Sequence, residues 1–436
     1  IEPIIKKEFM RQLLLTICSL CCFAAFSQNF YPPIVNYSVK DFGKLKNPEN
    51  YCVVQDHRGV MYFGNSHGVL EFDGEKWSFI QVGVGSFVRS LAVDNSGVIY
   101  AGIYGDFGYF TPDETGQLYF ESLMDKIPED DQFFSNVWKI HATNNAVYFQ
   151  TEEALFEYIL AEEKINVIYP EKSFHTSFLV DSTIYLRQRE VGIVEYKNGE
   201  LIPLKGTEDF MDYGVFGMHL LEDDSLLIIT QELGFYKWHN DSIRPLPDNN
   251  AIPLTDLGIF GSISLSDGDL ALNSFTNGLV IVDVEGNIKR KIDRSIGIRS
   301  DMVQYIYQDR DLNLWLALEN GISKVNYHSP LSYFNDKTGV EGNVQAIIRY
   351  KGDIYIGTSS GLFIKNDGLF GTRRFVNTGI VKDQVWDFEI VDNSLIVATA
   401  NGIFKTDNGS SFSQINREQT NTIIYRENRR DYIAGG

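Results

Sequence analysis

An internal repeat constrains the fold of this chain more than any other feature. Each unit has a strand, a turn, a second strand that ends in a small residue, a polar loop, and a residue, usually glycine, that opens a third strand. This opening residue falls at Gly68, Gly108, Ala154, Gly192, Gly234, Gly278, Gly321, Gly361 and Gly402. A period near 42 residues with three or four short strands per unit is typical of β-propeller blades. A β-α solenoid is disfavoured because no amphipathic helix of useful length separates the strands.

The number of units predicts how an all-β chain would be divided. Nine units are complete, and a tenth begins at Thr422 and is truncated at Gly436. Seven units would close one ring, so we expect a first propeller over residues 50–338 and the start of a second over 339–436. Residues 28–49 would provide a lead-in and a closing strand, and one larger ring is the alternative. Because an open blade edge invites pairing with other chains, we interpret the sequence as the N-terminal fragment of a longer protein.

The turn between the first two strands of a unit follows a pattern. Gly59 and Gly97 stand where a hairpin needs a positive φ. Leu312 occupies the same place in a later unit, where a left-handed Leu would cost about 1 kcal/mol. We therefore expect that turn to be rebuilt around Asn313. Asp309 and Asp311 alternate with Asn313 as calcium ligands do, but the loop lacks further oxygens, which favours a plain hairpin.

The N-terminal region predicts export. A charged start, an apolar stretch over residues 13–26 and a small-residue end indicate a signal peptide over residues 10–27, preceded by upstream residues 1–9. An uncleaved anchor is the alternative. Cleavage would leave Cys52 as the only cysteine, so no intramolecular disulfide is expected. No later stretch reaches about 18 apolar residues, so we expect no membrane span after the signal peptide.

Charge excludes some partners. The chain has 38 Lys and Arg against 58 Asp and Glu, a net charge of −20. This argues against contact with nucleic acid and against a polybasic membrane anchor. None of the seven histidines pairs with another at a zinc-ligand spacing within one segment, so no metal site is predicted. We also predict no cofactor and no catalytic residue.

Three segments carry a family resemblance. Residues 302–309 resemble the opening, and residues 356–362 the centre, of the repeat in the two-component-regulator propeller family of Bacteroidota. Residues 50–77 look like the first blade of exported sensors from that phylum. The resemblance implies two seven-bladed propellers, a Tyr-rich β-sandwich, a membrane span and a cytoplasmic kinase or helix-turn-helix output in a homodimer. It also implies a periplasmic ligand-sensing role for the region covered by this chain.

The loops of a propeller predict where a ligand would bind. The loop between strands two and three and the loop leading into strand one lie on the same concave face. Aromatic faces with polar partners suit a sugar, and an Arg could pair with the carboxylate of an acidic sugar. The candidates are Arg89, Tyr104, Asp106, Phe107, Trp138, His175, Arg187, Arg189, Gln231 and Trp386. Packing between blades is the alternative for the two tryptophans. We expect Arg187→Ala or Trp138→Ala to weaken ligand binding without unfolding the ring.

Three functional classes follow from this pattern. The leading hypothesis is a non-catalytic, periplasmic sensor of a small extracellular ligand such as an oligosaccharide. The second is a secreted propeller lyase or glycosidase acting on polysaccharide, which would need carboxylates or histidines clustered at the channel mouth. The third is a secreted scaffold or adhesin that binds a protein partner.

Overall fold

The computed structural model describes residues 32–43, 47–83, 86–331, 333, 338–367, 373–426 and 431–435. The signal peptide expected over residues 10–27 lies outside these ranges. In the described part of the chain, regular structure consists of strands and four single-turn helices, η1 (Met124–Lys126), η2 (Glu129–Asp131), η3 (Glu208–Met211) and η4 (Leu254–Leu257). None of the helices described here has the length and hydrophobicity needed to cross a membrane.

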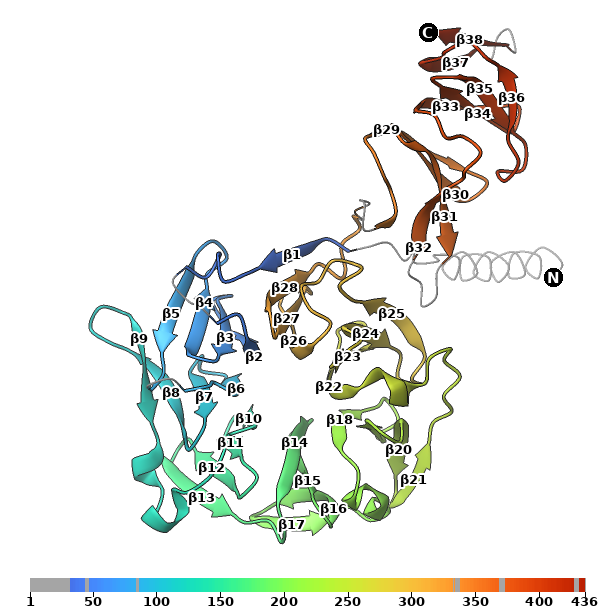
Figure 1. The fold of residues 1–436 in the computed structure, drawn as a ribbon. Helices are drawn as coiled ribbons and strands as arrows, with labels where there is room; N and C mark the ends of the chain where they lie inside the picture. Colours follow the sequence, from blue (N-terminus) through green and yellow to red (C-terminus); the bar gives the residue numbers. More distant parts are fainter. Residues whose placement is uncertain are drawn as a thin grey trace, which may run out of the picture.

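Seven four-stranded antiparallel sheets follow one another as the blades of a ring (Figure 1). The first three blades are β2 (Asn50–Gln55), β3 (Met61–Asn65), β4 (Gly68–Phe72), β5 (Trp77–Gln81); β6 (Ser90–Val93), β7 (Ile99–Ile103), β8 (Asp106–Pro112), β9 (Leu118–Ser122); and β10 (Lys139–Ala142), β11 (Ala146–Gln150), β12 (Leu155–Ile159), β13 (Lys164–Ile168). The next three are β14 (Phe174–Val180), β15 (Thr183–Gln188), β16 (Gly192–Lys197), β17 (Glu200–Pro203); β18 (Val215–Leu220), β19 (Leu226–Thr230), β20 (Phe235–His239), β21 (Ser242–Pro245); and β22 (Ile259–Ser264), β23 (Leu270–Ser274), β24 (Leu279–Val282), β25 (Ile288–Ile292). The seventh is β26 (Val303–Gln308), β27 (Leu314–Leu318), β28 (Gly321–Val325) and β1 (Ile34–Tyr37).

The ring closes through the seventh blade, which combines strands from both ends of this region. β1 pairs antiparallel with β28, with Ile34 opposite Val325 and Tyr37 opposite Ile322. The hydroxyl of Ser323 donates to Asn36 Oδ1 at 2.6 Å. Each innermost strand contacts that of the next blade, and β26 contacts β2. No blade of the ring is therefore left without a neighbour, which protects its edges.

Burial explains why the strands differ in composition along each blade. β7, β19 and β27 are buried at every position, because neighbouring blades cover both of their faces. The outermost strands β17 and β21 are mostly exposed. The acidic side chains of the chain can therefore remain solvated at the periphery of the ring.

The first hairpin of several blades is held by an aspartate. In the first blade, Oδ1 of Asp56 accepts hydrogen bonds from the backbone N–H groups of Arg58 and Val60, at 2.8 and 3.0 Å. The aspartates at positions 94 and 309 repeat this arrangement. The expectation that the third of these turns is rebuilt was wrong: Leu312 keeps the left-handed φ, at 63°, of the glycines it replaces. Asp309 accepts hydrogen bonds from the backbone N–H groups on either side of Leu312, which fixes the turn.

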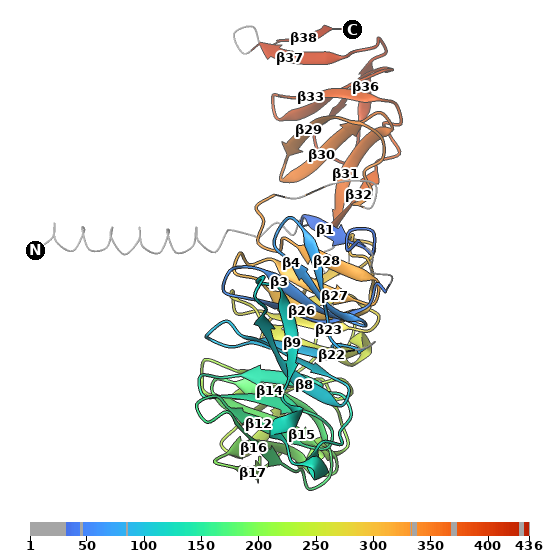
Figure 2. The same cartoon turned by 90° about the vertical axis from the view of Figure 1, so that its left-hand side faces the viewer.

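Beyond the ring lie two further four-stranded sheets and a two-stranded one (Figure 2). They comprise β29 (Val344–Tyr350), β30 (Asp353–Thr358), β31 (Gly361–Asp367) and β32 (Arg373–Asn377); β33 (Val385–Val391), β34 (Ser394–Thr399), β35 (Gly402–Thr406) and β36 (Ser413–Asn416); and β37 (Thr422–Arg426) with β38 (Asp431–Gly435). β29 contacts β33 and β33 contacts β37, as successive innermost strands do in the ring. The predicted all-β propeller class is confirmed.

Candidate ligand site in the centre of the ring

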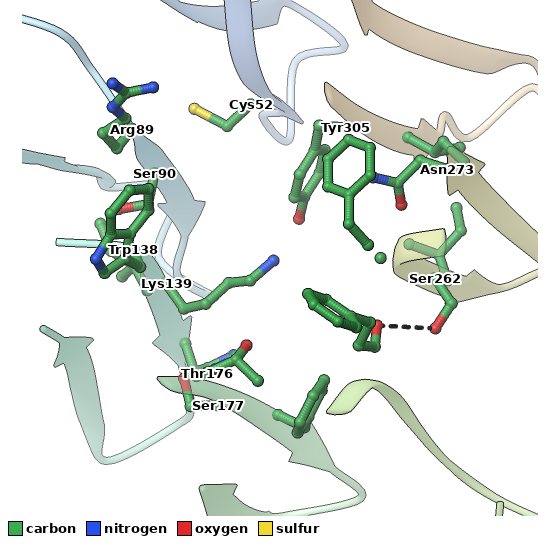
Figure 3. Close-up of a pocket in the computed structure, with 18 of the residues that line it drawn as sticks. Cys52, Arg89, Ser90, Trp138, Lys139, Thr176, Ser177, Ser262, Asn273 and Tyr305 are labelled. Carbon is green, nitrogen blue, oxygen red and sulfur yellow. Dashed lines mark hydrogen bonds between the residues drawn. The ribbon is translucent and has the colours of Figure 1, made fainter. Parts of the chain in front are cut away.

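A cavity of about 800 Å³ occupies the centre of the seven-bladed ring. Its walls are the innermost strands β2, β6, β10, β14, β18, β22 and β26, together with residues that flank them (Figure 3). The volume lies in the range of small-molecule sites in proteins. Each blade therefore contributes side chains to one shared site.

One residue per blade forms the rim of this cavity. Each follows a fully buried residue at, or just before, the start of the innermost strand, and all seven line the cavity. We call this set the mouth residues: Tyr51, Arg89, Trp138, His175, Phe216, Phe260 and Gln304. In five blades the register shifts at this residue, forming a β-bulge, whereas Arg89 and Trp138 directly precede β6 and β10. A bulge re-aims a side chain, and its repetition explains why these residues converge.

Arg89 lies among aromatic rings at the mouth. Its guanidinium carbon is 4.1 Å from the ring centre of Tyr51, 5.2 Å from that of Phe87 and 5.7 Å from that of Trp138. Cation–π contacts of this kind hold a guanidinium in place. The Nε atom of Arg89 is buried and has no hydrogen-bond partner among the described residues. The arrangement can therefore donate a hydrogen bond to an acceptor entering the mouth.

Lys139 brings a cation deeper into the cavity. It extends from β10 toward Tyr305, and its Nζ lies 5.4 Å from the centre of that ring (Figure 3). Burial lowers the pKa of the Lys139 ammonium. Burial also raises the pKa values of Tyr305 and of the nearby Cys52 thiol to about 12, so both groups are neutral at pH 7.

Three histidines line the wall in their neutral form. Burial lowers the pKa of His141 to about 3 and those of His175 and His219 to about 4. The ring nitrogens of His219 are 2.8 Å from the hydroxyls of Ser262 and Ser264. Nδ1 of His175 is buried without a partner in the described structure. His175 therefore offers a ring nitrogen to a ligand, and the three rings add no positive charge near neutral pH.

The structure brings four of the sequence-predicted residues together. Arg89, Trp138, His175 and Arg189 all line the cavity. Trp138 is 38% exposed, so it is not packed away between blades. Their roles in ligand binding stay predictions, but their convergence is a property of the fold.

Phe107 and Arg187 lie away from the cavity. Phe107 is fully buried and stacks on Phe149, with ring centres 4.1 Å apart. Arg187 is 4% exposed and donates from Nε to the carbonyl of Phe210 at 3.1 Å and from Nη2 to that of Met211 at 2.6 Å. These contacts give Arg187 a structural position beside η3, and we no longer expect its replacement to leave the ring's stability unchanged.

Four further candidates also lie outside the cavity lining. Tyr104 is 66% exposed and forms an isolated bridge with Asn136. Asp106 accepts a hydrogen bond from Ser122 at 2.7 Å, and burial raises the pKa of its carboxyl. Gln231 is half-buried in the turn between β19 and β20. Trp386 forms the bulge of β33, outside the ring, at the position equivalent to a mouth residue.

Sequence reasoning missed several cavity residues: Tyr51, Cys52, Lys139, Phe216, Phe260, Gln304 and Tyr305. A signal for the mouth residues was present, because each directly follows the buried residue that opens a unit. Lys139 had no such signal, because the direction of its side chain depends on where β10 begins, directly after Trp138, and a single sequence does not show that point.

Comparisons with solved structures place the fold. No protein-family model matches the sequence, and no curated protein matches it. The extracellular domain of BT3049 from B. thetaiotaomicron, assigned as a hybrid two component system, matches with a TM-score of 0.62 at 16% identity. That match covers 91% of this chain and 57% of that one. The fold is shared with such extracellular domains.

Two other solved structures, a second extracellular domain and a lyase, share the fold. The extracellular domain of BT4673 from the same organism, assigned as a one component system, gives a TM-score of 0.53 at 17% identity, over 90% of this chain and 56% of that one. Virginiamycin B lyase from Staphylococcus aureus matches with a TM-score of 0.52 at 13% identity. That match covers 68% of this chain and 98% of the lyase. The chain thus spans little more than half of the two extracellular domains. At these identities the comparison establishes the fold, and it agrees with the family resemblance of the repeat.

Proposed function

We propose that this chain is the extracytoplasmic, ligand-sensing region of a membrane-spanning signal-transduction regulator, and that a small extracellular ligand binds in the ring cavity. The observation that carries the proposal is the convergence of seven mouth residues, one from each blade, on one cavity. Five of them are aromatic side chains, counting His175, and aromatic faces suit the apolar faces of sugar rings. An oligosaccharide fragment therefore fits the site. The extracellular domains with the same fold belong to proteins assigned as signalling systems, which supports both the location and the role.

Signalling would follow from unequal affinity. A ligand shifts an equilibrium between two arrangements only if it binds one of them more tightly. The cavity touches all seven blades, so a ligand there would contact the whole ring at once. We propose that this contact biases the arrangement of two copies of the full-length protein, the homodimer implied by the family resemblance.

The enzyme alternative has less support in the cavity. Glycoside hydrolysis generally uses a pair of carboxyl groups, and the described lining includes one, Glu152. The His219–Ser262 pair resembles part of a nucleophile–base arrangement, but Nδ1 of His219 meets the Ser264 hydroxyl where a triad places a carboxylate. The match to virginiamycin B lyase keeps this alternative worth testing. Turnover of a polysaccharide by the purified chain would overturn the non-catalytic proposal.

The coding sequence beyond the codon for Gly436 tests the signalling role. The proposal predicts further repeats, an apolar segment of about 20 residues and a kinase or helix-turn-helix domain. A stop codon within a few repeats would contradict it, because no signal could then cross a membrane through this chain.

A further inference from the structure

The charge of the cavity opposes the charge of the chain. The whole protein carries a net charge of −20. Among the described residues that line the cavity, three side chains are cationic, Arg89, Lys139 and Arg189, and one is acidic, Glu152. An acidic protein that gathers cations around an internal cavity has a site complementary to negative charge.

Lys139 is the cation that most needs a partner. Its ammonium forms no ion pair with a carboxylate in the described structure, and its two electrostatic influences are burial and the Cys52 thiol. Its nearest aromatic neighbour, Tyr305, offers a ring face and a neutral hydroxyl. A cation removed from water without a counter-ion is costly, and an anion in the cavity would relieve that cost.

The mouth provides two further nitrogen atoms without partners. Arg89 Nε and His175 Nδ1 are both buried and unpaired in the described structure, and both residues line the cavity. Charge-assisted hydrogen bonds from a guanidinium to a carboxylate or sulfate are stronger than neutral ones. The aromatic mouth residues beside them suit the rest of a saccharide.

We propose that the cavity takes an anionic saccharide, whose carboxylate or sulfate group is held by Lys139 and whose entry is favoured by Arg89 at the mouth and by Arg189 in the cavity lining. This rests on the proposed ligand-sensing function and specifies its substrate class. Binding would place the anion between β10 and β26, joining the third and seventh blades through the ligand.

Calorimetric titration of the chain with sodium glucuronate, inorganic sulfate and glucose tests this proposal. We expect an anion to bind the wild type and glucose to bind it at least about tenfold more weakly. Lys139→Met should abolish this difference in affinity, and Lys139→Arg should preserve it. Lys164→Met is the matched control, because Lys164 is exposed at the start of the outer strand β13. Binding of glucuronate alone would identify a carboxylated ligand, and binding of sulfate alone a sulfated one.

Three results would overturn the anionic proposal: glucose binding as tightly as the anions, anion affinity unchanged in Lys139→Met, or no anion binding to the wild type. If Lys139→Met fails to fold, the salt dependence of binding to the wild type tests the proposal instead. The affinity of the wild type for the anion must then fall as sodium chloride screens the charges. A neutral oligosaccharide that needs Trp138 and not Lys139 would overturn this inference and leave the sensing function standing. Absence of binding by neutral and acidic oligosaccharides alike would contradict both.

Discussion

The Nζ atom of Lys139 and the ring of Tyr305 meet in the central cavity, 5.4 Å apart, although they come from the third and seventh blades. The contact exists only because the ring is closed. This contact depends on the geometry of the ring, since a change in the separation of the third and seventh blades would alter the environment of the buried Lys139 ammonium.

Ring closure can be tested by removing its last strand. We expect a chain that begins at residue 47 to have a lower melting temperature and a greater tendency to aggregate, because β28 would lose β1 and expose its edge. Asn36→Ala is the milder variant. It removes the hydrogen bond from Asn36 Nδ2 to the carbonyl of Gly297 at 2.8 Å and the acceptor for Ser323, and should cost about 1 kcal/mol. Thermal unfolding measures both, and an unchanged melting curve for the truncated chain would contradict the closing role of β1.

Arg187→Ala should destabilise the fourth blade. The side chain is buried and bonds the carbonyls of Phe210 and Met211, so its loss leaves acceptors unpaired at a cost of about 2 kcal/mol. Arg189→Ala is the control, because Arg189 is exposed, lines the cavity and should affect binding alone. Urea-induced unfolding of the two variants distinguishes these roles. Equal stability of both would show that the carbonyl contacts are unimportant.

Leu312→Gly should stabilise the seventh blade by about 1 kcal/mol, because Leu312 has a φ of 63° that glycine adopts without strain. Gly97→Ala provides the opposite change at the equivalent turn, where φ is 91°. A higher melting temperature for the first variant and a lower one for the second are expected. A destabilised Leu312→Gly variant would show that the leucine side chain contributes packing that outweighs its backbone strain.

Stability should fall as the pH drops from about 6.5 toward 4. The pKa of His141 is lowered from 6.5 to about 3 and that of His219 to about 4 in the folded chain. In this range the unfolded chain takes up protons on these residues and the folded chain does not, so acidification favours unfolding. Melting temperatures measured across this range should decline, and His219→Gln should reduce the slope. A flat profile for the wild type would contradict the burial of neutral histidines.

The repeat allowed the fold to be predicted because blade geometry is encoded locally. Glycines such as Gly97 mark positive-φ turns, and apolar runs such as Ile99–Ile103 mark strands buried between blades. The site was predicted only in part. Phe107 was expected in a loop, but β8 begins at Asp106, and the alternation of the strand turns Phe107 into the core.

The misplaced Arg187 and the missed Lys139 share another physical cause. Arg187 lies inside β15, one residue before its end, and reaches backbone carbonyls that belong to η3. Lys139 faces the cavity because of where β10 begins relative to Trp138. Such details of strand ends and bulges depend on packing across blades, which a single sequence does not display.

The central claim is that the ring cavity binds a small ligand through its mouth, and titration with oligosaccharide fragments, neutral and acidic, tests it most directly. The wild type should bind at least one fragment. Trp138→Ala should weaken that binding at least about tenfold with an unchanged melting temperature, since Trp138 is exposed at the mouth and its loss leaves no buried void. Trp238→Ala, in the outer part of the fifth blade, should leave affinity unchanged. Full affinity in Trp138→Ala, or binding lost equally in both variants, would contradict the claim.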